Sequence, residues 1–548
     1  VKQLNNNPNP DRAGKFNSDF NGQAQIISNG DLNIGGDLDA NYVATGKADS
    51  VINRGATIES LGDMQINTHT FKNDNADWQV IRVETARKDG FVGYSKAKDS
   101  TVYPDDRVEW SKTDKGLKAV ITIKPETPGE DPIKLGEDWY KIQYNEVTLD
   151  DKVATSDPAR MVSGQNLLIN GDNLASHKSQ INSGDGFALK AEGLQNDLNT
   201  ADGQQIKRIE NGTIEYHTVE SKATANPFGG FYKHVDKWHG ENPYLVTDKI
   251  LKTYELPILN AAINTIPTGL QDGQKATVDS LNRAINALNT LKQSTQSASN
   301  QTGSADNHAA AKQDALKLLA DFAKANPDNL TADQQKQLSD ILAAQKDGKG
   351  VSQAQLNGLI DSLNGSIKSQ YTEEVRATGN GPTLPNSSLY NIDPNNPNGY
   401  LVETDPAFAN YKKWLSSDYM MQRLGLDPSN MHKRLGDGYY EQGLIRDQVM
   451  TLTGRRFLGD YTTDDAMYQA LMDNGVATAK AINLRPGIAL TAEQMAQLTT
   501  DIVWLVEQTV TLKDGSKQTV LVPKVYVRSK VGDLKGDSSL IAARNMDM

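Results

Sequence analysis

The sequence predicts a mainly β protein in which short parallel coils are stacked and are interrupted by an α-helical module. Three observations support this prediction. A short phrase, of which Gly62-Asp63-Met64-Gln65-Ile66 is an example, recurs near both ends of the chain. Two of the segments that surround this phrase repeat the same spacing of twenty residues. Between residues 257 and 372, Leu and Ile instead fall at helical spacing.

The recurring phrase begins with Gly and ends on an apolar residue. Its other copies are GDLNI at 30–34, GQNLLI at 164–169, GDGFAL at 184–189 and GDSSLI at 536–541. Asn53 and Asn73 are twenty residues apart, a spacing that Ser176 and Asn196 repeat. Twenty residues suit one coil of a parallel β-helix, in which each coil contributes short strands to sheets that run along the axis.

Each position of the coil has an expected role. Ile58 and Ile181 are expected to point into the core, while stacked Asn or Ser side chains hydrogen-bond between coils. Gly62 and Gly184 are expected at corners with positive φ, a conformation that Gly adopts without steric cost. An ordinary hairpin-rich β domain is the alternative interpretation of the same pattern.

Two other sequence patterns interrupt the predicted coils. From about residue 79, alternating apolar and polar residues with turn signals predict an inserted β excursion. Within 257–372, Thr331 with Gln334 and Ser352 with Gln355 fit the capping box that starts a helix. The predicted divisions are coils at 1–78, the β excursion at 79–157, resumed coils at 158–222, an aromatic connector or cap at 223–256, the helical module at 257–384, a mixed α/β unit at 385–528 and further coils at 529–548.

Composition excludes several classes of function. The formal net charge is −12 and the sequence pI is about 5.2, which argues against a nucleic-acid partner because such binding depends on clustered Lys and Arg. The chain has no cysteine, so disulfides, thiol catalysis and cysteine metal sites are excluded. No apolar run is long enough to span a bilayer as a helix.

The search for chemistry predicts no catalytic, cofactor-binding or metal-binding residue. His234 and His239 are five residues apart, whereas a helical metal pair usually needs three or four. The segment 433–448 contains Asp437, Glu441, Arg446 and Asp447, from which an acid and a base could be assembled. Buried ion pairs and helix-face charges are the more frequent explanation of such residues.

Longer stretches resemble a known family. GATIESLGDMQI at 55–66, GYLVETDPAFANYKKWLSSDYMMQRLG at 399–425 and KRLGDGYYEQGLIRDQ at 433–448 are similar to CdiA-type effectors of contact-dependent growth inhibition, within the filamentous haemagglutinin superfamily. The resemblance covers roughly residues 20–78, 155–220 and 385–548, but not the helices. It implies a right-handed parallel β-helix with coils of the filamentous haemagglutinin type.

The resemblance also implies a function and partners. Such proteins are secreted through an outer-membrane partner of the producing cell, are exposed on the cell surface, and carry a toxin and a receptor-binding region. That region recognises an outer-membrane barrel protein on a neighbouring bacterium. The first hypothesis is therefore a non-catalytic, monomeric receptor-binding segment, with the helical module as the candidate surface. A general adhesin for host glycans or matrix is the alternative, and an enzyme centred on Asp437 and Glu441 is the third.

An aromatic cluster in the connector offers further candidates for receptor binding, because Tyr and Trp dominate binding hot spots. Sealing the open end of the stacked coils is the alternative role for these side chains. The candidates are Phe228, Phe231, Tyr232, Trp238 and Tyr244.

Overall fold

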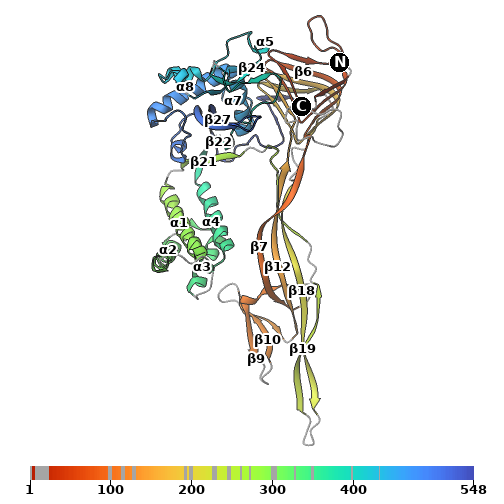
Figure 1. Cartoon of the computed structure of the whole chain (residues 1–548). Helices are drawn as coiled ribbons and strands as arrows, with labels where there is room; N and C mark the ends of the chain where they lie inside the picture. Colours follow the sequence, from red (N-terminus) through yellow and green to blue (C-terminus); the bar gives the residue numbers. More distant parts are fainter. Residues whose placement is uncertain are drawn as a thin grey trace. The chain divides into compact units, whose positions relative to one another are not determined.

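The computed structural model divides the chain into two units (Figure 1). The first contains Val1–Trp78, Ser156–Leu198 and Pro257–Met548, and the second contains Gln79–Thr155 and Asn199–Leu256. The protein is mainly β, with a helical module, as the sequence predicts. The structure describes residues 3–6, 24–96, 101–112, 118–125, 131–136, 138–190, 194–196, 202–224, 231–243, 248–259, 262–270, 273–297, 305–325, 329–346, 351–379, 381–396, 399–430 and 432–547.

Residues of the predicted coil segments form two sheets in which neighbouring strands pair in parallel. The first parallel sheet contains β2 (Gln25–Ser28), β5 (Thr57–Ser60), β13 (Arg160–Ser163), β15 (Gln180–Ser183) and β28 (Leu540–Ala542). The second contains β1 (Gln3–Asn6), β3 (Leu32–Ile34), β4 (Ala48–Arg54), β6 (Met64–Asp74), β14 (Leu167–His177), β16 (Gly186–Lys190), β17 (Leu194–Asn196) and β29 (Asn545–Asp547). Each strand of the first sheet is followed along the chain by one of the second, so the chain passes repeatedly between the two sheets.

Apolar side chains stack in register between these sheets. In the first parallel sheet, pairing places Ile58 beside Met161, and Met161 beside Ile181. All three are fully buried and share one core cluster with residues of the second sheet, which confirms the inward positions predicted for Ile58 and Ile181. Burying one such side chain contributes about 1.5–3 kcal/mol. The C-terminal strand β28 extends the row, because Ile541 pairs with Ile181.

A row of buried polar side chains runs through the second sheet. The Asn53 Nδ2 donates a hydrogen bond to Asn73 Oδ1 at 2.9 Å, and Asn73 Nδ2 donates to Ser176 Oγ at 3.3 Å. All three residues are at most 1% exposed, so these bonds satisfy groups that would otherwise be costly to bury. The inter-coil hydrogen bonding predicted from the twenty-residue spacing is confirmed.

Glycine is needed at the corners for a different reason from the one predicted. Gly62, Gly164 and Gly184 are not among the described residues with positive φ, so the predicted left-handed corner is wrong. A Cβ on Gly164 would lie 2.0 Å from the Leu61 carbonyl oxygen, and one on Gly184 would lie 2.1 Å from the Gly164 carbonyl oxygen. Glycine is required because the backbone of one coil lies directly against that of the next.

The second unit is built from long antiparallel strands. The main strands are β7 (Gln79–Ser95), β12 (Trp139–Thr155), β18 (Gly203–Thr224), β19 (Phe231–Pro243) and β20 (Lys249–Tyr254), with the short β8 (Tyr103–Pro104) beside β7. A smaller sheet contains β9 (Val108–Lys112), β10 (Lys118–Ile123) and β11 (Ile133–Gly136). Trp139 and Tyr94 are buried in a small apolar core of this unit.

One segment of this unit differs from the predicted divisions. Residues 203–222, expected in resumed coils, lie in β18, which pairs antiparallel with β12. The dipeptide Asn211-Gly212 lies where the register shifts opposite Tyr144, and Asn211 has φ of 52°. It is therefore a β-bulge within a continuous strand.

The helical module contains four helices: α1 (Lys275–Ser297), α2 (Ala305–Ala325), α3 (Ala332–Lys346) and α4 (Gln353–Lys368). Both predicted capping boxes are confirmed, since Ser352 and Gln355 exchange side-chain-to-backbone hydrogen bonds, as do Thr331 and Gln334. Among the described residues, no helix has the length and apolar character needed to cross a membrane.

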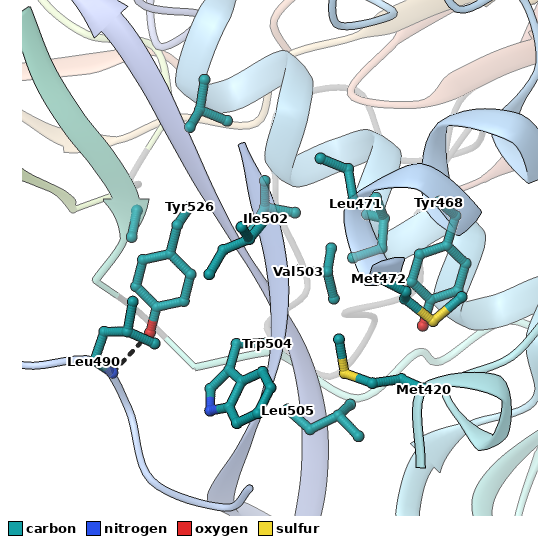
Figure 2. Close-up of a cluster of buried hydrophobic side chains, with 14 of the residues drawn as sticks. Met420, Tyr468, Leu471, Met472, Leu490, Ile502, Val503, Trp504, Leu505 and Tyr526 are labelled. Atoms are coloured by element: carbon teal, nitrogen blue, oxygen red, sulfur yellow. Dashed lines mark hydrogen bonds between the residues drawn. The ribbon is translucent and has the colours of Figure 1, made fainter. Parts of the chain in front are cut away.

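The mixed unit is a seven-stranded sheet with helices on it. Trp504 and Tyr526 are buried in its core, where Tyr468, Leu471 and Met472 of one helix pack (Figure 2). The strands are β21 (Ile263–Leu270), β22 (Tyr371–Thr378), β23 (Tyr390–Ile392), β24 (Tyr400–Thr404), β25 (Arg434–Gly436), β26 (Ile502–Thr511) and β27 (Lys517–Lys530). The helices are α5 (Pro406–Ala409), α6 (Asp418–Arg423), α7 (Gly438–Thr453), α8 (Asp464–Ile482) and α9 (Ala492–Ala496).

Replacing a corner glycine tests the close stacking of the coils. Gly164→Ala is expected to lower the free energy of unfolding by about 1–3 kcal/mol, because the new methyl group cannot fit against the Leu61 carbonyl. Gly30→Ala is the matched control, since a Cβ there would meet nothing within 4 Å. Urea denaturation of both variants makes the comparison. Equal stability of the two would contradict the stacking explanation.

Candidate receptor-binding site

The helical module is inserted into a β-hairpin. Strands β21 and β22 pair antiparallel, and the last pair in the ladder joins Leu270 to Tyr371. The chain therefore leaves the sheet at Leu270, forms α1 to α4, and returns at the neighbouring position (Figure 1). Since β21 is the edge strand of the seven-stranded sheet, the insertion leaves the rest of the sheet intact.

The module has its own core. Leu281, Leu288, Leu319 and Leu356 belong to an apolar cluster that draws on all four helices and is separate from the core of the mixed unit. Gln334 is 2% exposed, and its Nε2 donates to Ser362 O at 3.0 Å, Ser362 Oγ at 2.9 Å and Ser366 Oγ at 2.8 Å. These bonds join α3 to α4. The module is thus specified by its own residues rather than by the sheet that carries it.

The mixed unit is attached to the outward face of the first parallel sheet by buried charges. Arg446 of α7 forms an ion pair with Glu59 of β5, with Nη2 and Oε2 at 3.0 Å. Arg456 forms a bidentate pair with Asp464 at 2.6 and 2.9 Å, and Arg446 Nη1 lies 3.8 Å from Asp464 Oδ2. These residues are collectively called the anchor cluster.

Burial and charge act against each other in the anchor cluster. Burial raises the pKa of Glu59, although the attraction of Arg446 and Arg456 opposes it. Burial also acts to raise the pKa of Asp464, but there the two guanidinium groups outweigh it and the pKa is lowered. Further bonds join the same surfaces, since Asn182 Nδ2 donates to the Gly454 carbonyl at 3.0 Å. The cluster is an attachment point between two parts of one unit.

The carboxylates considered for catalysis have structural partners. Asp437 is the N-cap of α7 and accepts hydrogen bonds from Tyr440 N at 3.0 Å, Thr404 N at 2.6 Å and Thr404 Oγ1 at 2.9 Å. Glu441 is fully buried and accepts from Ser417 N at 2.6 Å, Ser417 Oγ at 2.7 Å and Tyr468 Oη at 3.0 Å.

The other two residues of that segment take part in attachment. Arg446 belongs to the anchor cluster, and Asp447 lies 3.5 Å from Arg160 Nη1 of β13. The structure therefore brings all four residues to contacts that support α7 and its attachment.

The aromatic candidates lie in or beside β19. The backbone pairs Phe231 with Thr224, Tyr232 with Ala223 and Trp238 with His217, all of β18. Phe228 and Tyr244 lie outside the described residues. A role of these aromatic residues in receptor binding or in sealing the coils stays a prediction.

The two neighbouring histidines lie on the same strand. His234 pairs with Ser221, and His239 pairs with Tyr216 and has Nε2 2.8 Å from Thr218 Oγ1. In the part of the chain that the structure describes, no group of three or more His, Asp or Glu residues is placed to hold a metal ion.

Sequence reasoning missed the anchor residues Glu59, Arg456 and Asp464. The alternation around Ile58 could have indicated that Glu59 points outward, away from the core of the coils. Its partner could not have been found that way, because Arg446 is 387 residues further along the chain.

The fold and the inserted module define the class of protein, a parallel-stranded scaffold that carries a separate helical module. Similar curated proteins are of the CdiA type. The chain is 52% identical over 151 residues to Toxin CdiA of Yersinia pestis, covering 27% of the chain and 4% of the relative. It is 44% identical over 168 residues to tRNA nuclease CdiA-2 of Burkholderia pseudomallei (strain 1026b), covering 30% and 5%.

A third relative, Toxin CdiA of Escherichia coli, is 33% identical over 162 residues, which is 30% of the chain and 5% of that protein. The chain thus spans about one twentieth of the length of these relatives. No family model and no solved structure matches it. These similarities agree with the resemblance that the motifs indicated, because about 30% of the chain is similar to CdiA-type proteins.

Removing the ion pair between Arg446 and Glu59 is expected to destabilise the fold. Arg446→Met should lower the free energy of unfolding by about 3–5 kcal/mol, because Glu59 would stay buried without its cation. The double variant Glu59→Gln with Arg446→Met should recover a large part of that loss. Lys275→Met, which removes an exposed pair with Asp279, serves as control and should change little. Urea denaturation that gives the single and double variants the same loss would contradict this account.

The pH dependence of stability should report on Glu441. Burial raises the pKa of Glu441 to about 7 from 4.5, although bonds from Ser417 and Tyr468 oppose the shift. Because the folded pKa is the higher one, the stability that the protonated group contributes is full below pH 4.5 and is lost as the pH rises through about 7. Glu441→Gln cannot ionise.

That variant should therefore gain stability relative to the unaltered chain, by up to about 3 kcal/mol, as the pH is raised through this window. Urea denaturation at a series of pH values measures the difference. Asp340→Asn, at an exposed position of α3, is the control and should leave the slope unchanged. A difference between Glu441→Gln and the unaltered chain that does not vary with pH would refute the prediction.

Proposed function

We propose that this chain is the non-catalytic receptor-binding segment of a secreted toxin-delivery filament of contact-dependent growth inhibition. Its receptor is proposed to be an outer-membrane protein on neighbouring bacteria. The observation that carries the proposal is the helical module, a bundle with its own core placed between adjacent ends of β21 and β22. A repetitive scaffold presents the same surface many times, so recognition of one partner needs an irregular element of this kind.

The parallel strands are proposed to be coils of a right-handed β-helix that forms the filament. Support comes from the alternation of strands between two parallel sheets, their shared apolar core and the buried Asn and Ser row. Strands β28 and β29 pair with β15 and β16, so the coils before and after the helical module and the mixed unit form one stack. The anchor cluster would then hold the mixed unit on that stack.

The location and partners follow from the CdiA-type similarity. The filament is proposed to be exported through an outer-membrane secretion partner and to be exposed on the producing cell as a monomer. Some relatives are named tRNA nucleases, but the chain spans only 5% of their length. No enzymatic role is proposed for this segment. The hydrogen bonds that Asp437 and Glu441 accept support that view.

Excision of the module tests the proposal. Residues 271–370 are replaced by Asn-Gly, which joins the paired positions Leu270 and Tyr371 in a tight hairpin turn. The excised chain is expected to keep the core around Trp504, as judged by near-ultraviolet circular dichroism, and to lose binding to whole target cells by at least tenfold. A chain with an unrelated four-helix bundle at the same site is the matched control for bulk and should also fail to bind.

Two outcomes would redirect the assignment. Undiminished binding by the folded, excised chain would remove the module from the interface. Binding by the unaltered chain that survives protease treatment of the target cells but is lost after glycosidase treatment would favour the adhesin for glycans or matrix.

A further inference from the structure

A cavity of about 470 Å³ lies between the outward face of the first parallel sheet and the mixed unit. Thr57 and Glu59 of β5 and Arg160 of β13 line one side, and Tyr439 and Gln442 of α7 line the other. Its volume is within the range of about 300–1,000 Å³ that small-molecule sites occupy. None of its lining residues belongs to the helices α1 to α4.

Aromatic side chains form much of the wall. Tyr390 and Tyr440 meet edge to face with ring centroids 5.2 Å apart, and Trp414 and Tyr439 meet in the same way at 4.9 Å. Burial raises the pKa of all three tyrosines, so their hydroxyls stay protonated and able to donate. Within the described structure, none of these three hydroxyls has a hydrogen-bond acceptor.

The cavity also contains an unpaired acceptor. Gln442 is 3% exposed, and its Nε2 donates to Leu415 O at 3.1 Å and Asp465 Oδ1 at 2.6 Å. Those two bonds fix the orientation of the amide, and its Oε1 is buried without a donor. A buried carbonyl oxygen left in this state costs about 1–3 kcal/mol. The cavity wall thus offers three hydroxyl donors that have no acceptor among the described residues, and Gln442 adds an acceptor that is itself buried.

The charges around the cavity are already paired with one another. Arg446 faces Glu59 and Asp464, and Arg160 lies 3.5 Å from Asp447. An anionic or cationic ligand would therefore have to displace a partner from an ion pair that is already formed. A neutral ligand with several hydroxyl groups and an apolar face meets the same surface without that cost.

We propose that this cavity binds a neutral saccharide unit, a hexose or an N-acetylhexosamine. The C–H face of the sugar would lie on the tyrosine and tryptophan rings. Its hydroxyls would accept hydrogen bonds from the tyrosine hydroxyls. The inference goes beyond the receptor-binding function proposed above and does not depend on it, because the cavity is formed by the coils and the mixed unit alone.

The test uses the full chain and isothermal titration calorimetry. The probes are glucose, galactose, N-acetylglucosamine and N-acetylgalactosamine, with N-acetylneuraminic acid as the anionic comparator. At least one neutral sugar is expected to bind the unaltered chain. The triple variant Tyr390→Phe, Tyr439→Phe and Tyr440→Phe keeps the rings and removes the donors, and it should weaken that binding by at least tenfold. Tyr371→Phe, outside the cavity, is the matched control and should bind normally.

Several results would overturn the proposal. They are the absence of binding by every neutral sugar at millimolar concentration, equal binding by the triple variant, and a preference for the anionic sugar. Thermal denaturation of the triple variant shows whether it is folded, and Tyr390→Phe alone gives a milder second test. The chain with 271–370 excised should bind the same sugar as before. Failure of this inference is therefore separable from failure of the receptor-binding proposal.

Discussion

The close, in-register pairing of parallel strands is the constraint on which the rest of the first unit depends. Ile58, Met161 and Ile181 lie in one buried row, and period-two alternation then directs their neighbours outward. A slip of one residue would bury Glu59 in the apolar core and expose Ile58. The register that builds the core thereby also places the charged and polar groups that hold the mixed unit. Glycine at the corners belongs to the same constraint, because a methyl group at Gly164 has no space beside Leu61.

Buried paired charges take part in the attachment of the mixed unit. Removing two charges from water is costly, and the attraction between them repays this only when geometry and further hydrogen bonds are good. In the anchor cluster, Arg446 faces both Glu59 and Asp464, and Arg456 completes a bidentate pair with Asp464. Such a cluster specifies one relative position of the two surfaces, since a shifted arrangement would leave charges unpaired. It also leaves space beside the ion pairs, which is where the tyrosine-lined cavity lies.

Insertions occur where the chain can leave and return at adjacent positions. The helical module departs and re-enters at paired residues of β21 and β22, and its helices close their own core. The coil stack tolerates interruption in the same sense, because β28 rejoins β15 in register after the helical module and the mixed unit.

Local pattern in the sequence was enough to determine the inward row, the polar row at twenty-residue spacing and the capping boxes. These features depend on residues that are near one another in one coil, one helix turn or one turn. The pairing of β18 with β12, the reason for the corner glycines, the partner of Glu59 and the cavity beside it were decided only by the tertiary structure. Each of them depends on which distant segments meet, and Glu59 meets a residue 387 positions away. Periodicity indicates the face of a sheet or helix on which a side chain lies. Long-range packing decides which residue it meets there.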